Sequence, residues 1–203
     1  MEELPLKNAS IRIRLITLVV ALSLILIAGI ITQPKHLDNY VQYNCDVKNF
    51  SLSTEIHISS DNTKIGKVSG NIFRFVEDPL TLTDTDGNQL AYAGDSYHFI
   101  SQDSHSIIVG DTVSAEMVGL TKLLGNAYDI YNADGQKIAY AKFNALNTAG
   151  ELYDVNGKLI ATYGSFVYFK DFTVKISKDC ELDPSTALMI FCSYYSDQAY
   201  DNS

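Results

Sequence analysis

The chain has 203 residues, of which 46% are hydrophobic and 19% are charged, so it can form a packed core and is not wholly disordered. Fifteen lysines and arginines against 24 aspartates and glutamates give a net charge of −9. This charge argues against sequence-independent nucleic-acid binding, which needs a surplus of cations. Three cysteines are too few for a disulfide scaffold or a cysteine-rich metal site.

The N-terminal part of the chain contains a long apolar segment. Residues 15–34 carry no charged side chain, and the sequence from Leu15 to Ile31 reads LITLVVALSLILIAGII. A helix of about 20 apolar residues, rising ~1.5 Å per residue, crosses the ~30 Å hydrocarbon core of a bilayer. The segment therefore predicts a transmembrane helix over residues 15–34, preceded by a short cytoplasmic N-terminus of residues 1–14.

The alternative for this segment is a cleaved signal peptide. Signal peptides have an apolar region of about 7–15 residues, followed by small residues at positions −3 and −1 from the cleavage site. The apolar run here is longer. Its nearest approach to a cleavage site, Ile27-Ala28-Gly29, has a large residue at −3. We therefore expect an uncleaved signal anchor.

Charged residues around the predicted span indicate its orientation. Lys7, Arg12 and Arg14 precede the span, and Lys35 is the first cation after it. Because lysine and arginine favour the cytoplasmic side, we expect a single-pass protein of the cell membrane whose remaining residues lie outside the cell. Residues 35–203 hold 12 of the 15 basic and 22 of the 24 acidic residues, a net charge of −10. Anionic lipid headgroups should repel this part of the chain.

The pattern after the span changes to that of β-structure. We expect a juxtamembrane linker over residues 35–44, followed by one domain over residues 45–203. In Phe50–Ile58 and Phe172–Lys178, apolar residues alternate with polar ones. Such alternation is typical of strands with one buried and one solvated face.

Three short segments repeat a turn signal. The repeats begin at Asp84, Asn132 and Asp154, and each contains Asp-Gly or Asn-Gly. These dipeptides favour two-residue hairpin turns in which both central residues adopt positive φ. We expect looser turns at Ser59–Thr63 and Gln102–Ser106. The pattern predicts a mainly β fold of roughly ten to twelve short antiparallel strands, whose edges need closure or stacking.

One C-terminal segment departs from this pattern. Asp183-Pro184 is a helix start, with aspartate as the N-cap and proline at the first helical position. The apolar run within Ser185–Tyr200 covers the whole circumference of a helix. A helix that is apolar all round is buried or lies in a membrane, and this one is too short to span. We therefore expect a helix buried inside the β-structure. Its buried residues should include Leu188, Met189, Ile190, Phe191 and Cys192.

These elements together resemble a known family. Three segments are similar to the LURP-one-related proteins: Tyr128–Gly135, Leu152–Ala161 and the terminal helix at Asp183–Tyr195. Those proteins share the tubby C-terminal fold with phospholipid scramblases. The resemblance covers roughly residues 45–200 and implies a closed antiparallel barrel of about 12 strands around a buried C-terminal helix. It also implies a role connected with membrane lipids or signalling.

A catalytic pattern is hard to assemble from these residues. Gly94-Asp95-Ser96-Tyr97 matches the Gly-Asp-Ser block of one esterase class. That class also needs an Asp-x-x-His near the C-terminus, whereas all four histidines precede residue 106. A turn between strands explains the block better. Ser96 nevertheless supports an alternative interpretation, in which the protein is a hydrolase.

Two histidines and two cysteines complete the candidates. His98 and His105 would meet across a hairpin centred near Asp103, where with a carboxylate they would suit zinc. Cross-strand surface histidines are commoner than metal sites, so we predict no bound metal and no cofactor. Cys45 opens the first strand of the predicted domain and Cys180 follows the last one, and outside the cell these two residues form a candidate disulfide.

We expect a membrane-anchored, extracytoplasmic β-barrel with a non-catalytic binding or structural role at the cell envelope. Its one predicted partner is the membrane that holds the anchor, and nucleic acid is not expected. The rival hypothesis is an enzyme, either a hydrolase using Ser96 or a metal-dependent enzyme using His98 and His105. A further alternative is lipid handling by the barrel, with the central helix as a removable plug.

Overall fold

The computed structural model describes residues 16–20, 34–50, 53–71, 80–95, 104–120, 125–165 and 171–201. The chain divides into two compact units, residues 1–33 and residues 34–203. In the first unit, residues 16–20 are helical and their side chains are exposed. Most of the predicted membrane span, residues 15–34, lies outside the described residues. Within the described ranges, no helix combines the length and the apolar character that crossing a membrane requires.

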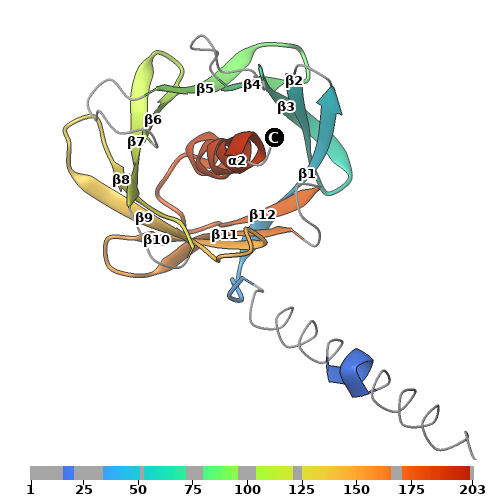
Figure 1. Cartoon of the computed structure of the whole chain (residues 1–203). Coiled ribbons are helices and arrows are strands. Elements are labelled where there is room, and N and C mark those ends of the chain that lie inside the picture. The colour runs from blue at the N-terminus through green and yellow to red at the C-terminus, as the bar shows by residue number, and fades with distance from the viewer. Residues whose placement is uncertain are drawn as a thin grey trace, which may run out of the picture. The chain divides into compact units, whose positions relative to one another are not determined.

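The second unit is a closed barrel of twelve antiparallel strands, as the sequence predicts (Figure 1). Each strand pairs with its neighbours in the chain, and the last strand pairs with the first. The strands are β1 (Tyr40–Phe50), β2 (Ser53–Ser60), β3 (Thr63–Asn71), β4 (Leu80–Asp84), β5 (Gln89–Asp95), β6 (Ser104–Val109), β7 (Thr112–Leu120), β8 (Ala127–Tyr131), β9 (Lys137–Phe143), β10 (Ala149–Asp154), β11 (Leu159–Ser165) and β12 (Phe172–Ser177).

The barrel closes between β1 and β12, where Tyr40 lies opposite Ser177 and Cys45 lies opposite Phe172. Closure satisfies the backbone groups that would otherwise form two free edges. Because β1 already begins at Tyr40, residues 40–44 of the predicted linker are part of the barrel wall. The single strand suggested by the alternation in Phe50–Ile58 is instead the end of β1 and the start of β2.

The three repeated turns differ from the two-residue form that their Asp-Gly and Asn-Gly pairs predict. In the first repeat, Gly87 N–H donates to the Asp84 carbonyl, and Gly87 has a φ of 88° while the residue before it has an ordinary φ. This is a four-residue turn with glycine in the left-handed region, and the strand register shifts just before it, between Leu82 and Thr83. The bulge absorbs the extra residue of the turn.

The two-residue turn with positive φ at both central positions occurs elsewhere, between β2 and β3. Asp61 and Asn62 have φ values of 49° and 61°, and Ser60 lies opposite Thr63. Asp and Asn tolerate the left-handed region better than other non-glycine residues. The Ser59–Thr63 turn is therefore confirmed, but it is tighter than the sequence suggests.

The C-terminal helix α2 (Pro184–Asp201) runs through the interior of the barrel (Figure 1). Asp183 caps its start, because its Oδ1 accepts a hydrogen bond from the Ser185 backbone N–H at 2.7 Å. From Leu188 to Cys192 the side chains are 0–4% exposed, which confirms the predicted buried helix. The surrounding wall leaves room for it, because many inward positions carry alanine. These buried alanines are Ala91, Ala93, Ala115, Ala139, Ala141 and Ala161.

Candidate functional site

The residues of the enzyme hypothesis do not come together in the described part of the barrel. Ser96 and His98 lie outside the described residues. His105 stands on β6, and its Nε2 lies 2.8 Å from Asp197 Oδ2 on α2, with both side chains largely buried. In the described ranges, no three His, Cys, Asp or Glu side chains are grouped closely enough to hold a metal ion. His105 therefore contacts the central helix rather than a described partner for catalysis.

The predicted Cys45–Cys180 disulfide is not formed, and all three cysteines are free thiols. Cys45 lies opposite Phe172, the first residue of β12, whereas Cys180 follows Ser177 at its other end. Five residues of strand separate these ends by about 17 Å. A disulfide needs Cα atoms within about 7 Å. The predicted disulfide is therefore wrong, because Cys45 of β1 lies beside the first residue of β12 and Cys180 lies beyond the last residue of that strand.

Cys45 belongs instead to the barrel interior, together with Cys192 of α2. Both thiols are buried, and burial raises the pKa of Cys45 well above its usual value and the pKa of Cys192 to about 12. Desolvation penalises a thiolate, so these two side chains stay neutral. They are packing residues of the core and not nucleophiles.

Polar contacts hold α2 in place near both of its ends. Near its start, the Thr186 and Ser114 hydroxyls lie 2.6 Å apart. Near its end, Asn147 accepts a hydrogen bond from the Tyr194 hydroxyl and donates one to Gln198 Oε1 at 2.7 Å. With the apolar centre packed and both ends bonded, α2 occupies the space that a ligand inside the barrel would need.

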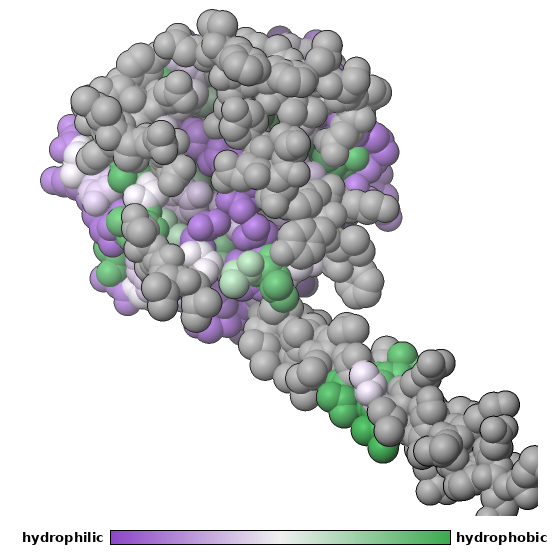
Figure 2. Space-filling view, in the orientation of Figure 1, coloured by the Kyte–Doolittle hydropathy of each residue, from purple (hydrophilic) through white to green (hydrophobic). Residues whose placement is uncertain are grey.

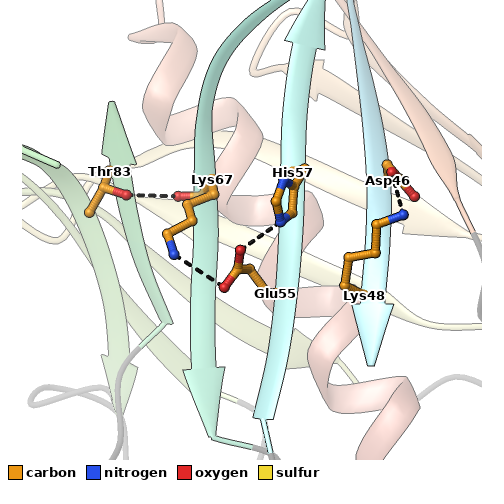
Figure 3. Close-up of polar contacts among 6 residues, drawn as sticks. All are labelled: Asp46, Lys48, Glu55, His57, Lys67 and Thr83. Carbon is orange, nitrogen blue, oxygen red and sulfur yellow. Dashed lines mark hydrogen bonds and ion pairs between the residues drawn. The ribbon is translucent and has the colours of Figure 1, made fainter. Parts of the chain in front are cut away.

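One outer surface, on β1 to β4, consists of charges that neutralise one another (Figure 3). Glu55 contacts His57 at 2.6 Å and Lys67 at 3.1 Å, while Lys48 contacts Asp46 at 2.7 Å. Hydrogen bonding to Lys67 lowers the pKa of Glu55, and hydrogen bonding to Lys48 lowers the pKa of Asp46. Because each carboxylate already has a cation beside it, this surface stabilises strand pairing and offers little charge to a ligand.

A second outer surface, on β8 to β10, has a different chemistry, and we call it the lysine–tyrosine surface. Tyr140 of β9 and Tyr153 of β10 lie opposite each other in register and stack, with ring centroids 4.9 Å apart and planes at 12°. Three ammonium groups surround the two rings. Lys142 is 5.0 Å from the Tyr140 centroid and 5.3 Å from that of Tyr153, while Lys137 and Lys35 lie over one ring each. The remaining members are the carboxylates of Asp129 and Glu151.

The two carboxylates of this surface are already engaged. Asp129 pairs with Lys137 at 2.6 Å. Glu151 accepts a hydrogen bond from the Tyr153 hydroxyl and lies 3.6 Å from Lys35 Nζ. The Lys35 ammonium also donates to the Tyr153 oxygen at 2.6 Å, and this hydrogen bond is the main cause that raises the pKa of Lys35.

Lys142 is the exception on this surface. It lies directly opposite Glu151 in the register, yet that carboxylate bonds to Tyr153 and Lys35 instead. Among the described residues Lys142 makes contacts with the two tyrosine rings and with no carboxylate. In a chain of net charge −9, Lys142 is thus an exposed cation without a described carboxylate partner.

A hollow of about 270 Å³ lies beside Tyr140 on the outer wall. Its lining combines three aliphatic residues, two tyrosines and one ion pair. The lining residues are Leu120, Ala127, Tyr128, Asp129, Lys137, Tyr140 and Ala141. A second, wider hollow of about 510 Å³ lies beside β1 and the β2–β3 turn. It has one tyrosine, Tyr40, and one lysine, Lys178, but no stacked pair of rings.

The sequence reasoning did not single out the lysine–tyrosine surface, although one signal was available. In Lys137–Phe143 the inward residues Ala139, Ala141 and Phe143 are buried, so Tyr140 and Lys142 face outward. The alternation thus places a tyrosine and a lysine on the same face of one strand. The second ring and the third lysine come from other segments of the chain.

Comparison with known proteins adds no further evidence on this site. No protein-family model matches the chain, and no curated protein matches it at a significant level of sequence similarity.

Proposed function

We propose that this protein is a membrane-anchored, extracytoplasmic module that acts by binding at the outer wall of its barrel. The observation that carries the proposal is that α2 fills the barrel and is bonded near both ends. Ligand pockets need concave space with a few convergent polar groups. The two hollows described above are lined by residues of the barrel wall and its turns, and by no residue of α2.

The anchor and the orientation are the other parts of the proposal. Residues 15–34 form an uncleaved transmembrane helix, with the N-terminus in the cytoplasm and residues 35–203 outside the cell. The apolar run and the three cations before it support this arrangement. The hydropathy of the described residues supports a membrane anchor and a solvent-exposed barrel. On the face shown in Figure 2, the described barrel residues are mostly hydrophilic, while residues 16–20 are mostly hydrophobic.

The family is also part of the proposal. A closed barrel around a C-terminal helix is the architecture that the resemblance to LURP-one-related proteins implies. We propose that residues 45–200 belong to that group, because the architecture matches the one that the resemblance implies and because the hairpin sequence is repeated. A shared fold does not fix the ligand, so binding is argued from the surface of this chain alone.

Accessibility of single cysteines in intact cells tests the proposed topology. Cys180 is replaced by serine, because it is the one native cysteine that is not fully buried. Lys64→Cys, at an exposed position near the β2–β3 turn, should then react with a membrane-impermeant maleimide added outside. Ser10→Cys is the matched control and should react only after permeabilisation. The opposite pattern would place the barrel in the cytoplasm and overturn the proposal.

A further inference from the structure

We propose that the lysine–tyrosine surface is a binding site for an acidic sugar unit of an extracellular glycan. The inference rests on the proposed function, because it names the ligand class of the outer wall. The sugar ring would occupy the hollow beside Tyr140, and its carboxylate or phosphate group would pair with Lys142. Four observations carry this assignment.

The first observation is the size of the hollow. Pockets for drug-sized ligands measure about 300–1,000 Å³, and this one measures about 270 Å³. It is therefore smaller than a pocket for a drug-sized ligand, and we assign it to a single sugar ring. An open hollow of this size on the outer wall also allows a polymer to continue across the surface at both sides of the bound unit.

The second observation is the aromatic wall. Tyr140 stacks on Tyr153 on one side and lines the hollow, which Tyr153 does not reach. The stack restrains the Tyr140 ring, so little side-chain freedom is lost when a ligand packs against it. An aromatic ring offers a flat apolar surface to the C–H groups of a sugar, while its hydroxyl group remains available for hydrogen bonding.

The third observation is the polar pair at the edge of the hollow. Asp129 and Lys137 hold each other at 2.6 Å and both line the hollow. Together they offer acceptors and donors for sugar hydroxyl groups, with no net charge. A fixed pair of this kind orients a ligand without attracting ions of either sign.

The fourth observation is the charge of Lys142. Its ammonium group lies within about 5 Å of both ring centroids and makes no ion pair with any described carboxylate. Glu151, its neighbour across the strand pair, is turned toward Lys35 and Tyr153. The surface therefore has one cation with no described carboxylate partner, 5.0 Å from the ring centroid of Tyr140, which lines the hollow.

The second hollow has no stacked pair of tyrosines and no ion pair in its described lining, which makes it a useful comparison. Lys175 lies 4.6 Å from the Tyr40 ring centroid on the outer wall of β12 and β1. Like Lys142, it lines neither hollow but lies close to a tyrosine that lines one. Lys175→Gln is therefore a control for Lys142→Gln, because each variant removes one ammonium group that lies about 5 Å from a tyrosine ring of a hollow.

The test is binding of a hyaluronan hexasaccharide, an oligomer that contains glucuronate, to the full chain in detergent micelles by isothermal titration calorimetry. We expect binding that weakens about three- to tenfold in Lys142→Gln, about tenfold in Tyr140→Ala and not in Lys175→Gln. Raising the salt concentration should weaken binding, since exposed ion pairs are screened. Thermal melting of each variant shows that the barrel remains folded. If Tyr140→Ala does not fold, Tyr140→Leu replaces it.

Four outcomes would overturn the inference. Equal binding of a neutral chitin hexasaccharide would show that the site does not recognise the anionic group. Equal effects of Lys142→Gln and Lys175→Gln would show that the lysine–tyrosine surface is not the specific binding site. Absence of binding to the acidic oligomer, or binding to anionic vesicles that depends on Lys142, would assign the surface to something other than a glycan. The maleimide experiment separates this failure from failure of the proposed function, because Lys64→Cys can be labelled from outside in either case.

Discussion

At the scale of single residues, two histidine–aspartate pairs of similar length differ in burial and in whether they join two elements of the fold. His105 and Asp197 are 2.8 Å apart with side chains 5% and 14% exposed, while His36 and Asp38 are 3.0 Å apart with side chains 80% and 93% exposed. Loss of a buried hydrogen bond to a charged group costs about 1–3 kcal/mol. We therefore expect Asp197→Ala to lower the free energy of unfolding by that amount, measured by urea denaturation.

Asp38→Ala is the control for this prediction, because an exposed pair contributes at most about 1 kcal/mol and often nothing measurable. Its free energy of unfolding should match that of the unchanged protein within error. If the two variants lost equal amounts, the bond between His105 and α2 would contribute nothing to holding the helix.

Buried acidic groups predict a loss of stability in alkaline solution. Burial raises the pKa of Cys45, Cys192 and Tyr163 in the folded protein. The unfolded chain therefore releases these protons first as the pH rises. Stability is full below about pH 8.5, the pKa of an unfolded cysteine, and each deprotonating group then removes about 1.4 kcal/mol per pH unit. For Cys192 the loss continues toward its folded pKa of about 12.

Urea denaturation at a series of pH values from 8 to 10.5 measures this loss. We expect Cys192→Ala to show a shallower decline than the unchanged protein, because one of the contributing groups is gone. A free energy of unfolding that stays constant over this range would contradict the prediction and indicate that water reaches the thiols in the folded state.

At the scale of elements, the repeated turns depend on glycine for conformation and not for space. Gly135 has a φ of 75°, and a Cβ added there would meet no atom within 4 Å. Gly135→Ala should therefore cost about 1 kcal/mol through backbone strain alone. Gly135→Asn should cost less, since asparagine tolerates the left-handed region. Chemical denaturation of both variants tests this order, and equal losses would contradict it.

Much of the architecture could be predicted from sequence patterns of this kind, whereas turn geometry could not. Alternation, turn dipeptides and the apolar run after Asp183 predict the barrel and its central helix. The form of each hairpin depends on whether a bulge is present, and a bulge arises from the pairing of two strands. For this reason the Asp-Gly turns are longer than predicted, and the tightest turn lies at Asp61 and Asn62.

At the scale of the whole molecule, barrel and helix should unfold together. Phe191 of α2 is fully buried and packs against Tyr163 and Phe143 of the wall, with ring centroids 5.9 Å and 6.0 Å apart. Phe191→Ala should lower the free energy of unfolding by about 3–5 kcal/mol. Far-UV and near-UV circular dichroism should still give coincident transitions.

Leu146→Ala is the control for the Phe191 variant, because Leu146 is 41% exposed and outside the core. It should change the free energy of unfolding by less than about 0.5 kcal/mol. If Phe191→Ala instead lost its helical signal before its β signal, α2 would be a separable plug, and the interior would be open to the lipid-handling alternative.

The candidate site belongs to this larger scale, which explains why sequence reasoning did not find it. Alternation shows that Tyr140 and Lys142 face outward, but not which residues of the next strand lie beside them. A register shifted by two residues would keep every side chain on its face and place Tyr153 opposite Lys142 instead of Tyr140. Lys35 comes from a segment far away in the chain. Only the closed barrel brings these groups together.

The closure of β1 on β12 has a consequence for how the protein is made. β1 leaves the ribosome before the other strands of the barrel, and its closing partner β12 leaves after ten further strands, with α2 behind it. During synthesis, one edge of β1 therefore stays unpaired while ten strands are added to the other side, and the interior has no helix to cover it. Pairings between residues so far apart form slowly, and exposed strand edges invite association with other chains. The growing chain should consequently depend on chaperones until its last segment arrives.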